Sequence, residues 1–218
     1  MNDPSNVLDR VRRALGRTGP MEAPPVPPKI DEPVARLVHT DFGLPELWAK
    51  RAAEMKVDVE LCYPEELASK LVAYLAAQGA KRIGISESKL LSAVELPQAL
   101  AAAGVSATAW PQLGLDAAYD LDAAVTDATY AVAETGSLVV LPHAGHGRAL
   151  SLVPKLHVAI LEPKNFVPDL LDLMEKLAGD ESWSHATLIT GPSKTSDIEM
   201  KLVTGVHGPY VVKAYVLQ

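Results

Sequence analysis

From residue 44 onward, short apolar runs alternate with segments whose apolar residues recur at helical spacing. The runs VDVELCY, RIGIS, VSATAW, SLVVL, HVAIL, TLIT and YVVKAYVL are typical of strands that are buried on both sides. One intervening helix is predicted to begin at Pro64 and to end before Gly79. The alternation predicts an α/β fold, with a mostly parallel sheet and helices on both faces. Lys213 and Tyr215 share one face of the last strand, which favours an edge position for it.

The N-terminal region differs from the rest of the chain. Residues 4–15 place apolar side chains at helical spacing, and four arginines make the region 1–18 a basic helix. The region 19–33 is rich in proline, which predicts a semi-rigid linker, and the α/β domain is expected to span 34–218. The basic helix is either a docking arm for an acidic surface or an ordinary solvated helix.

Composition excludes several classes of protein. The formal net charge of −7 argues against a non-specific nucleic-acid binder. No apolar run is long enough to span a membrane, and MNDPSNVLDRVRRALGR lacks the apolar region of a secretory signal, so we expect a cytoplasmic protein. Cys62 is the only cysteine, which excludes an internal disulfide and a cysteine-ligated iron–sulfur cluster within this chain.

The loop GPSKTSDIE, which follows the run TLIT, has two interpretations. It lacks the second glycine of the GxxxxGK[ST] motif, so a nucleoside triphosphate site of that type is not expected. Backbone N–H groups of residues 191–196 at a helix N-terminus, together with the charge of Lys194, would suit a small anion. Alternatively, Ser196 and Glu199 form a capping box, with Asp197 in the first turn of the helix. The two roles are compatible.

Two further loops carry polar residues beside glycines. In AETGS, Glu134 is a candidate nucleophile or general base, although it could equally anchor the loop. Gly136 can supply a positive φ at the same turn. In PHAGHGRALS, Arg148 follows a glycine and could hold a carboxylate or phosphate, or form an ordinary ion pair.

The histidines give weaker indications. His143 and His146 are three residues apart, but no cysteine or carboxylate lies at the usual metal-ligand spacing, so a structural or surface role is favoured. His207 lies on a constrained turn in GVHGP, where it is a candidate acid or a structural residue.

Three segments in order, AETGSLVVL, GRALSLVPKLHVAIL and ITGPSKTSDIEMKLVTGVHGP, resemble the LUD-domain family, in particular its lactate-utilisation C group. The resemblance is dense over residues 125–217 and looser from residue 44 and in the N-terminal helix. It implies a fold similar to that of ribose-phosphate isomerases and CoA transferases. Matched to the motifs of the family, the functional positions are Glu134, Thr135, Gly136, Arg148, Ser151, Gly191, Ser193, Thr195, Asp197, Glu199 and His207.

Loop chemistry and resemblance combine into one assignment. Glu134 is the candidate catalytic residue, Ser196, Asp197 and Glu199 are assigned to a helix cap, and no metal ligand is assigned. We expect the loops to converge on one pocket at the carboxyl edge of the sheet. The candidate substrate- or anion-binding residues are Thr135, Gly136, Ser137, Arg148, Ser151, Gly191, Ser193, Lys194, Thr195 and His207.

The resemblance implies membership of a three-protein system that oxidises L-lactate to pyruvate, in which companion subunits carry the iron–sulfur clusters. The chain would then be a non-redox subunit without a cofactor of its own, binding a small carboxylate or its companions. Two alternatives stay open: an independent CoA-transferase or hydrolase that uses Glu134, and an ATP enzyme similar to folate cyclo-ligases. Each alternative would need a long glycine-rich loop, and none is obvious in the sequence.

We predict that the purified chain holds no stoichiometric iron, zinc or flavin. It has one cysteine, no clustered metal-ligand spacing and no GxGxxG fingerprint. Elemental analysis and a visible spectrum of native protein test this prediction. One metal ion per chain that survives dialysis against a weak chelator would contradict it.

Overall fold

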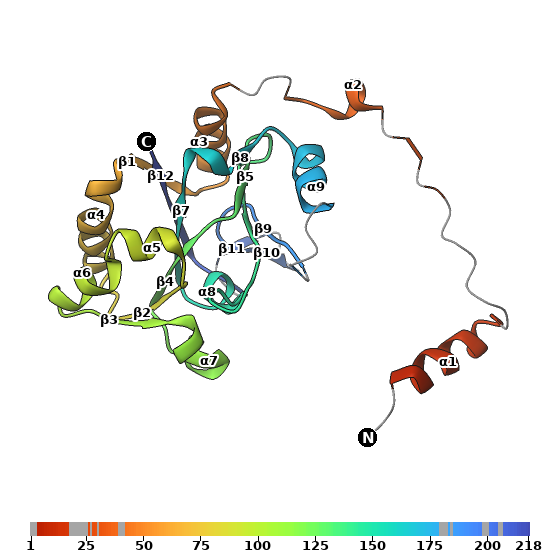
Figure 1. Ribbon diagram of the computed structural model, residues 1–218, viewed down its shortest axis with the longest axis horizontal. Helices are drawn as coiled ribbons and strands as arrows, with labels where there is room; N and C mark the ends of the chain where they lie inside the picture. The colour runs from red at the N-terminus through yellow and green to blue at the C-terminus, as the bar shows by residue number, and fades with distance from the viewer. Residues whose placement is uncertain are drawn as a thin grey trace. The chain divides into compact units, whose positions relative to one another are not determined.

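The structure is a computed structural model that describes residues 4–17, 26, 28, 29, 31–38, 42–178, 183, 185–197, 201–204 and 207–218 (Figure 1). The chain divides into two compact units, Met1–Ala35 and Arg36–Gln218. The first unit contains α1 (Pro4–Ala14) and α2 (Glu32–Ala35), so the predicted N-terminal helix is present. Most of the predicted linker lies outside the described residues.

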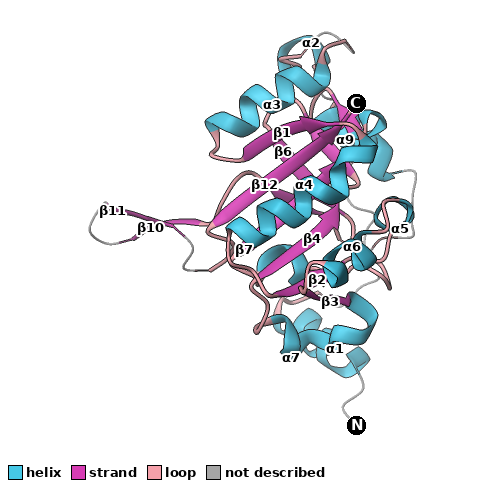
Figure 2. Cartoon of the chain, turned by 90° about the vertical axis from the view of Figure 1, so that its left-hand side faces the viewer, coloured by secondary structure: helices cyan, strands magenta, loops and turns pink. Residues whose placement is uncertain are grey.

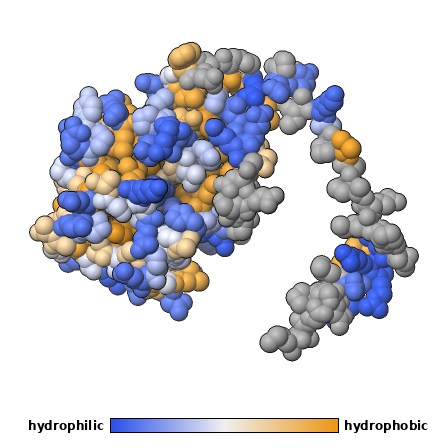
Figure 3. Space-filling view, in the orientation of Figure 1, coloured by the Kyte–Doolittle hydropathy of each residue, from blue (hydrophilic) through white to orange (hydrophobic). Residues whose placement is uncertain are grey.

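Helix α1 is amphipathic, and the described side chains of its apolar stripe are exposed. Val7, Val11 and Leu15 are spaced one helical turn apart, and all three are exposed. Arg12 pairs with Asp9 at 3.3 Å on the helix surface. Hydrophilic and hydrophobic residues therefore lie together on the surface of this short helix, as Figure 3 shows.

The second unit is built on a six-stranded sheet in which every pair of neighbours is parallel. Its strands in spatial order are β1 (Asp58–Cys62), β12 (Val211–Leu217), β7 (Leu156–Leu161), β4 (Ala123–Asp127), β2 (Arg82–Ile85) and β3 (Ser106–Ala109). All residues of β7 are buried, as expected of a strand covered on both faces. The last strand, β12, lies between β1 and β7, so the predicted edge position for it is wrong.

Helices cover one face of this main sheet. They are α4 (Pro64–Ala77), α5 (Lys89–Ala93) and α6 (Leu96–Ala102), and Figure 2 shows α4 in front of the sheet, roughly aligned with its strands. Leu67, Leu71 and Leu75 of α4 are fully buried against the sheet. Pro97 does not kink a long helix, because α5 ends at Ala93 and Pro97 lies in the first turn of α6.

The opposite face is covered by α3 (Leu44–Glu54), α7 (Trp110–Ala118), α8 (Ala149–Leu152) and a second sheet. The second sheet contains β8 (Phe166–Val167), β5 (Tyr130–Val132), β6 (Ser137–Val140) and β9 (Thr187–Ile189). The 3₁₀ helix η1 (Pro163–Asn165) leads into β8, and α9 (Leu170–Ala178) packs on the other face of the second sheet, where Leu173 and Leu177 join Val132 and Val139. The runs SLVVL and TLIT are thus strands, as predicted, but they pair antiparallel in this separate sheet.

The segment after Thr190 forms a two-stranded hairpin. Strand β10 (Lys194–Asp197) pairs antiparallel with β11 (Lys201–Thr204), and the hairpin extends from the rest of the unit (Figure 2). The predicted helix cap is therefore wrong, because Ser196 and Asp197 lie in a strand; Glu199 lies outside the described residues. Thr195, Val203 and Thr204 are β-branched, which favours the extended backbone over a helix at these positions.

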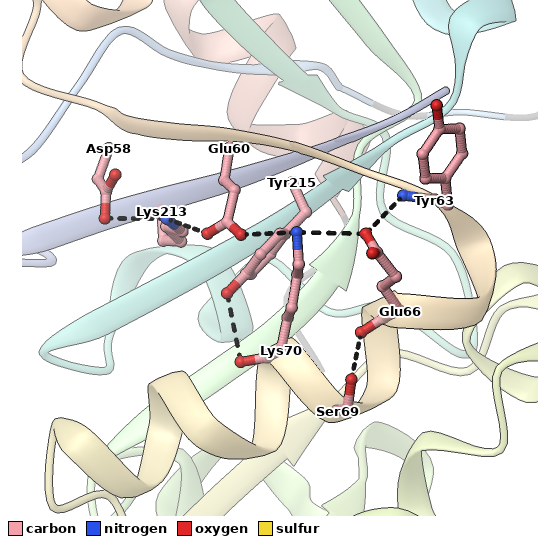
Figure 4. A network of polar contacts seen from close by, with 8 residues as sticks. All are labelled: Asp58, Glu60, Tyr63, Glu66, Ser69, Lys70, Lys213 and Tyr215. Carbon is pink, nitrogen blue, oxygen red and sulfur yellow. Dashed lines mark hydrogen bonds and ion pairs between the residues drawn. The ribbon is translucent and has the colours of Figure 1, made fainter.

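Lys213 of β12 is almost completely buried, and two carboxylates of β1 neutralise it (Figure 4). Its ammonium lies 3.1 Å from Asp58 and 3.0 Å from Glu60, above the rings of Tyr74 and Tyr215. Burial opposes ionisation of the Glu60 carboxyl. Hydrogen bonds from Lys213 and Lys70 outweigh this effect, so the pKa of Glu60 lies below its ordinary value. These contacts compensate for the loss of hydration when the Lys213 ammonium is buried in the sheet.

We predict that deletion of residues 1–33 leaves the second unit folded. The described cores of the second unit are built from residues between 38 and 217, which the deletion leaves in place, so the free energy of unfolding should change by less than about 1 kcal/mol, or about 2–4 °C in the melting midpoint. Thermal unfolding of the full and truncated chains measures this. A much lower midpoint or an insoluble product would show that the segment belongs to the fold of the second unit.

Candidate functional site

The carboxyl ends of three neighbouring strands of the main sheet, β2, β4 and β7, surround a cavity of 360 Å³. Open parallel sheets bind their ligands at this edge, where strand ends and loops meet. The charged, hydroxyl, amide and imidazole side chains that line the cavity are those of Ser88, Lys89, Asp127, Thr129, His143, Glu162, Lys164 and Asn165. The cavity is therefore our candidate functional site.

Asp127 is the central polar residue of the site. It is the last residue of β4, and its carboxylate Oδ1 accepts a hydrogen bond of 2.8 Å from Ser86 Oγ, just beyond the end of β2. The backbone N–H of Ser86 in turn donates to Val125 O at 3.1 Å. Pairing of β2 with β4 thus fixes both side chains, while the Asp127 side chain keeps 29% of its surface exposed.

The loop 142–148, which follows β6, closes one side of the site. His143 and His146 exchange backbone hydrogen bonds of 3.1 and 3.0 Å, and Gly145 N donates to His143 Nδ1 at 3.1 Å. A further bond of 2.8 Å from Glu87 N to Gly145 O ties the loop to the end of β2. A Cβ on Gly147 would lie 2.0 Å from the Trp110 ring. Close packing therefore requires glycine at position 147, and the hydrogen bonds give the loop a defined conformation.

Two histidines are buried in this region, one within the loop (His146) and one in β7 (His157). Burial lowers the pKa of His146 to about 4 and the pKa of His157 to about 3, so both are neutral at pH 7. His146 Nδ1 lies 4.0 Å from Asp127 Oδ1, and His157 Nε2 bonds Thr126 Oγ1 at 2.9 Å. No described residue bonds His146 Nε2, His157 Nδ1 or Ser151 Oγ, although all three atoms are buried. Such atoms commonly bind internal water.

The sequence-predicted loops 134–137 and 190–194 do come together, but around the end of α3. The Ser137 hydroxyl bonds both Thr135 Oγ1 and Thr190 Oγ1 at 2.7 Å. A Cβ on Gly136 would lie 2.5 Å from Ala52 N, and one on Gly191 would lie 2.3 Å from Met55 O. The contacts explain why both motifs need glycine beside this helix.

Lys194 also belongs to this junction. Its ammonium donates to Met55 O at 3.3 Å, at the C-terminal end of α3. Helix carbonyls carry partial negative charge at this end and attract a cation. The contact gives Lys194 a role in helix termination.

The remaining predicted residues are spread over other places. Glu134 lies at the closed end of the β5–β6 hairpin, where its N–H bonds Pro168 O at 2.9 Å. Thr129 and Leu141, at the open end of the same hairpin, line the cavity instead. Arg148 is exposed before α8, and Ser151 is buried within that helix.

Ser193 and His207 lie at the opposite edge of the main sheet. Ser193 N bonds Pro209 O at 2.9 Å, and Tyr210 N bonds Lys155 O at 2.8 Å, next to the amino ends of β12 and β7. His207 is exposed in the adjoining turn. The backbone of Thr195 lies in β10. Among the residues that the structure describes, none of the predicted site residues lines the cavity.

A simple sequence signal could have pointed to this edge of the sheet. Asp127 ends the apolar strand AAVTD, Glu162 follows HVAIL directly, and Ser86, which donates a hydrogen bond to Asp127, follows RIGI directly. Polar side chains at successive strand ends mark the carboxyl edge of a parallel sheet. The sequence analysis instead predicted the binding site in glycine-containing loops next to strands that belong to the second sheet.

Comparisons with known proteins agree with the predicted family. The family model described as LUD domain matches residues 45–217. A protein named lactate utilization protein C from Halalkalibacterium halodurans is 38% identical over 100 residues, or 44% of this chain and 44% of that protein. A protein of the same name from Exiguobacterium sp. is 37% identical over 112 residues, which cover 49% of this chain and 48% of that protein. The matches thus span less than half the length of these relatives.

The fold also has a solved counterpart. A DUF162 family protein from Deinococcus radiodurans superposes with a TM-score of 0.62 at 22% sequence identity, covering 83% of this chain and 99% of that one. The predicted α/β class, with its mostly parallel sheet, is therefore confirmed. Within the described part of the chain, no helix has the length and apolar character needed to cross a membrane.

We predict that Gly136→Ala destabilises the protein more than Gly79→Ala. Both glycines have a φ near +70°, at 69° and 68°, but a Cβ on Gly79 meets nothing within 4 Å. Gly79→Ala should cost about 1 kcal/mol of strain. Gly136→Ala should add about 1–3 kcal/mol of overpacking against α3. Chemical denaturation of both variants measures the difference, and equal losses would mean that the contact with Ala52 is unimportant.

Proposed function

The chain belongs to the LUD domain family, and we propose that it acts in lactate utilisation as a subunit without a redox centre of its own. The observation that carries this proposal is the match of the family model to residues 45–217, together with relatives named lactate utilization protein C in several bacteria. Because those relatives are matched over less than half their length, the reaction and the partners are inferred for this chain.

The absence of a redox centre is inferred from the donor atoms of the chain. Iron–sulfur clusters are held mainly by several cysteine thiolates. Cys62 is the only cysteine, it is buried, and burial raises the pKa of its thiol, which opposes formation of the thiolate. We therefore assign electron transfer from lactate to iron–sulfur clusters in companion subunits. This chain would hold the substrate or assemble those subunits.

The two alternative functions have less support. A CoA-transferase or hydrolase would need Glu134 at a substrate cavity, yet Glu134 lies at the far end of the β5–β6 hairpin from Thr129 and Leu141, which line the cavity. An ATP enzyme would need a phosphate-binding loop, and the segment after Thr190 is a β-hairpin in place of a loop that enters a helix.

A deletion in the native organism tests the proposal. We expect a strain that lacks this gene, and every other route of lactate oxidation, to lose growth on L-lactate while growing normally on pyruvate. An affinity-tagged copy should restore growth and copurify with proteins that contain iron and acid-labile sulfide. Normal growth of the deletion strain on L-lactate would refute a role in lactate utilisation. Restored growth without any iron-containing companion would refute the assignment as a complex subunit.

A further inference from the structure

Lys89 is a cation of the cavity without a partner. Two lysines line the cavity, and Glu162 Oε2 holds the ammonium of Lys164 at 2.7 Å. The Lys89 side chain is exposed at the start of α5, and it makes no ion pair or hydrogen bond with any residue that the structure describes. Its ammonium is thus available to a negatively charged ligand.

Asp127 offers a free acceptor in the same cavity. Its Oδ1 is occupied by the Ser86 hydroxyl, and within the described residues no donor reaches its Oδ2. The neighbouring His146 is neutral, so it leaves the charge of the carboxylate uncompensated. A ligand that donates a hydrogen bond can therefore bind at Oδ2.

Charge restricts the class of ligand further. The lining contains two positive charges, on Lys89 and Lys164, and two negative charges, on Asp127 and Glu162. The net charge of the described residues around the cavity is therefore zero. Polyphosphates and dicarboxylates are disfavoured, because they would bring several negative charges with one unpaired ammonium to meet them. The side chains of Leu90, Leu141 and Pro142 supply apolar surface for a short alkyl group.

We propose that this cavity binds a small 2-hydroxy acid, with the carboxylate of the ligand on Lys89 and its hydroxyl donating to Asp127 Oδ2. The proposal rests on the proposed function, which suggests L-lactate as the member of this class. It also predicts selectivity. A 2-oxo acid has no hydroxyl and would place a carbonyl oxygen against the Asp127 carboxylate, so L-lactate should bind more tightly than pyruvate.

Calorimetric titration of the full chain at pH 7.5 with L-lactate, pyruvate and propionate tests these roles separately. We expect affinity to fall in the order L-lactate, propionate, pyruvate. Lys89→Ala should weaken all three by about tenfold or more, the size of a lost hydrogen bond between charged groups. Asp127→Asn should remove the preference for L-lactate over pyruvate, because the amide can donate to a carbonyl.

Matched variants control for charge and for the alternative location. Lys155→Ala removes an exposed lysine at the amino end of β7, the opposite edge of the sheet, and should leave all three affinities unchanged. Arg148→Ala tests the loops first predicted to bind the anion. Each variant is checked for folding by its melting midpoint. Loss of binding in Arg148→Ala with normal binding in Lys89→Ala would overturn our assignment and favour those loops.

The outcomes separate this inference from the proposed function. If the native chain binds none of the three acids at tens of millimolar, the hydroxy-acid site is refuted, and the growth phenotype still decides lactate utilisation. If binding follows the expected pattern but the deletion strain grows on L-lactate, the site stands and the proposed function fails. Tighter binding of pyruvate than of L-lactate by the native chain would overturn the role given to Asp127.

Discussion

The main sheet is parallel throughout, so both of its faces must be covered by other parts of the chain. Helices α4, α5 and α6 cover one face with a leucine-rich core. The other face is shared by α3, α7, α8 and the second sheet, and small residues such as Ala159 and Ala214 allow that sheet to pack closely on β7 and β12. The remaining features of the second unit follow from how this second face is covered.

Covering the second face also creates the candidate site. Only Ala128 and Thr129 separate β4 from β5, so the chain leaves the main sheet at Asp127 and enters the second sheet at once. Strand β6 then returns the chain to the same edge, where the loop 142–148 folds over the ends of β2 and β4. The cavity lies where the two sheets meet, and the packing of both holds its side chains.

Sequence patterns predicted the elements of the fold better than their pairing. The leucine spacing after Pro64 predicted α4, and continuous apolar runs predicted buried strands, because burial of both faces leaves a direct trace in composition. A run such as SLVVL is equally apolar in either sheet, so its partner could not be predicted. Asp127 and Ser86 each stand at the end of an apolar run, which the sequence shows, but the contact between them depends on the pairing of β2 with β4, which could not be predicted either.

Strand β1 forms an outer edge of the main sheet, and its charges have a consequence for association between molecules. The Asp58 and Glu60 side chains keep 53% and 36% of their surface exposed while they hold the buried Lys213. A foreign strand that added to β1 would have to strip water from both carboxylates without offering them a new cation. Edge-to-edge polymerisation of the sheet is thereby discouraged.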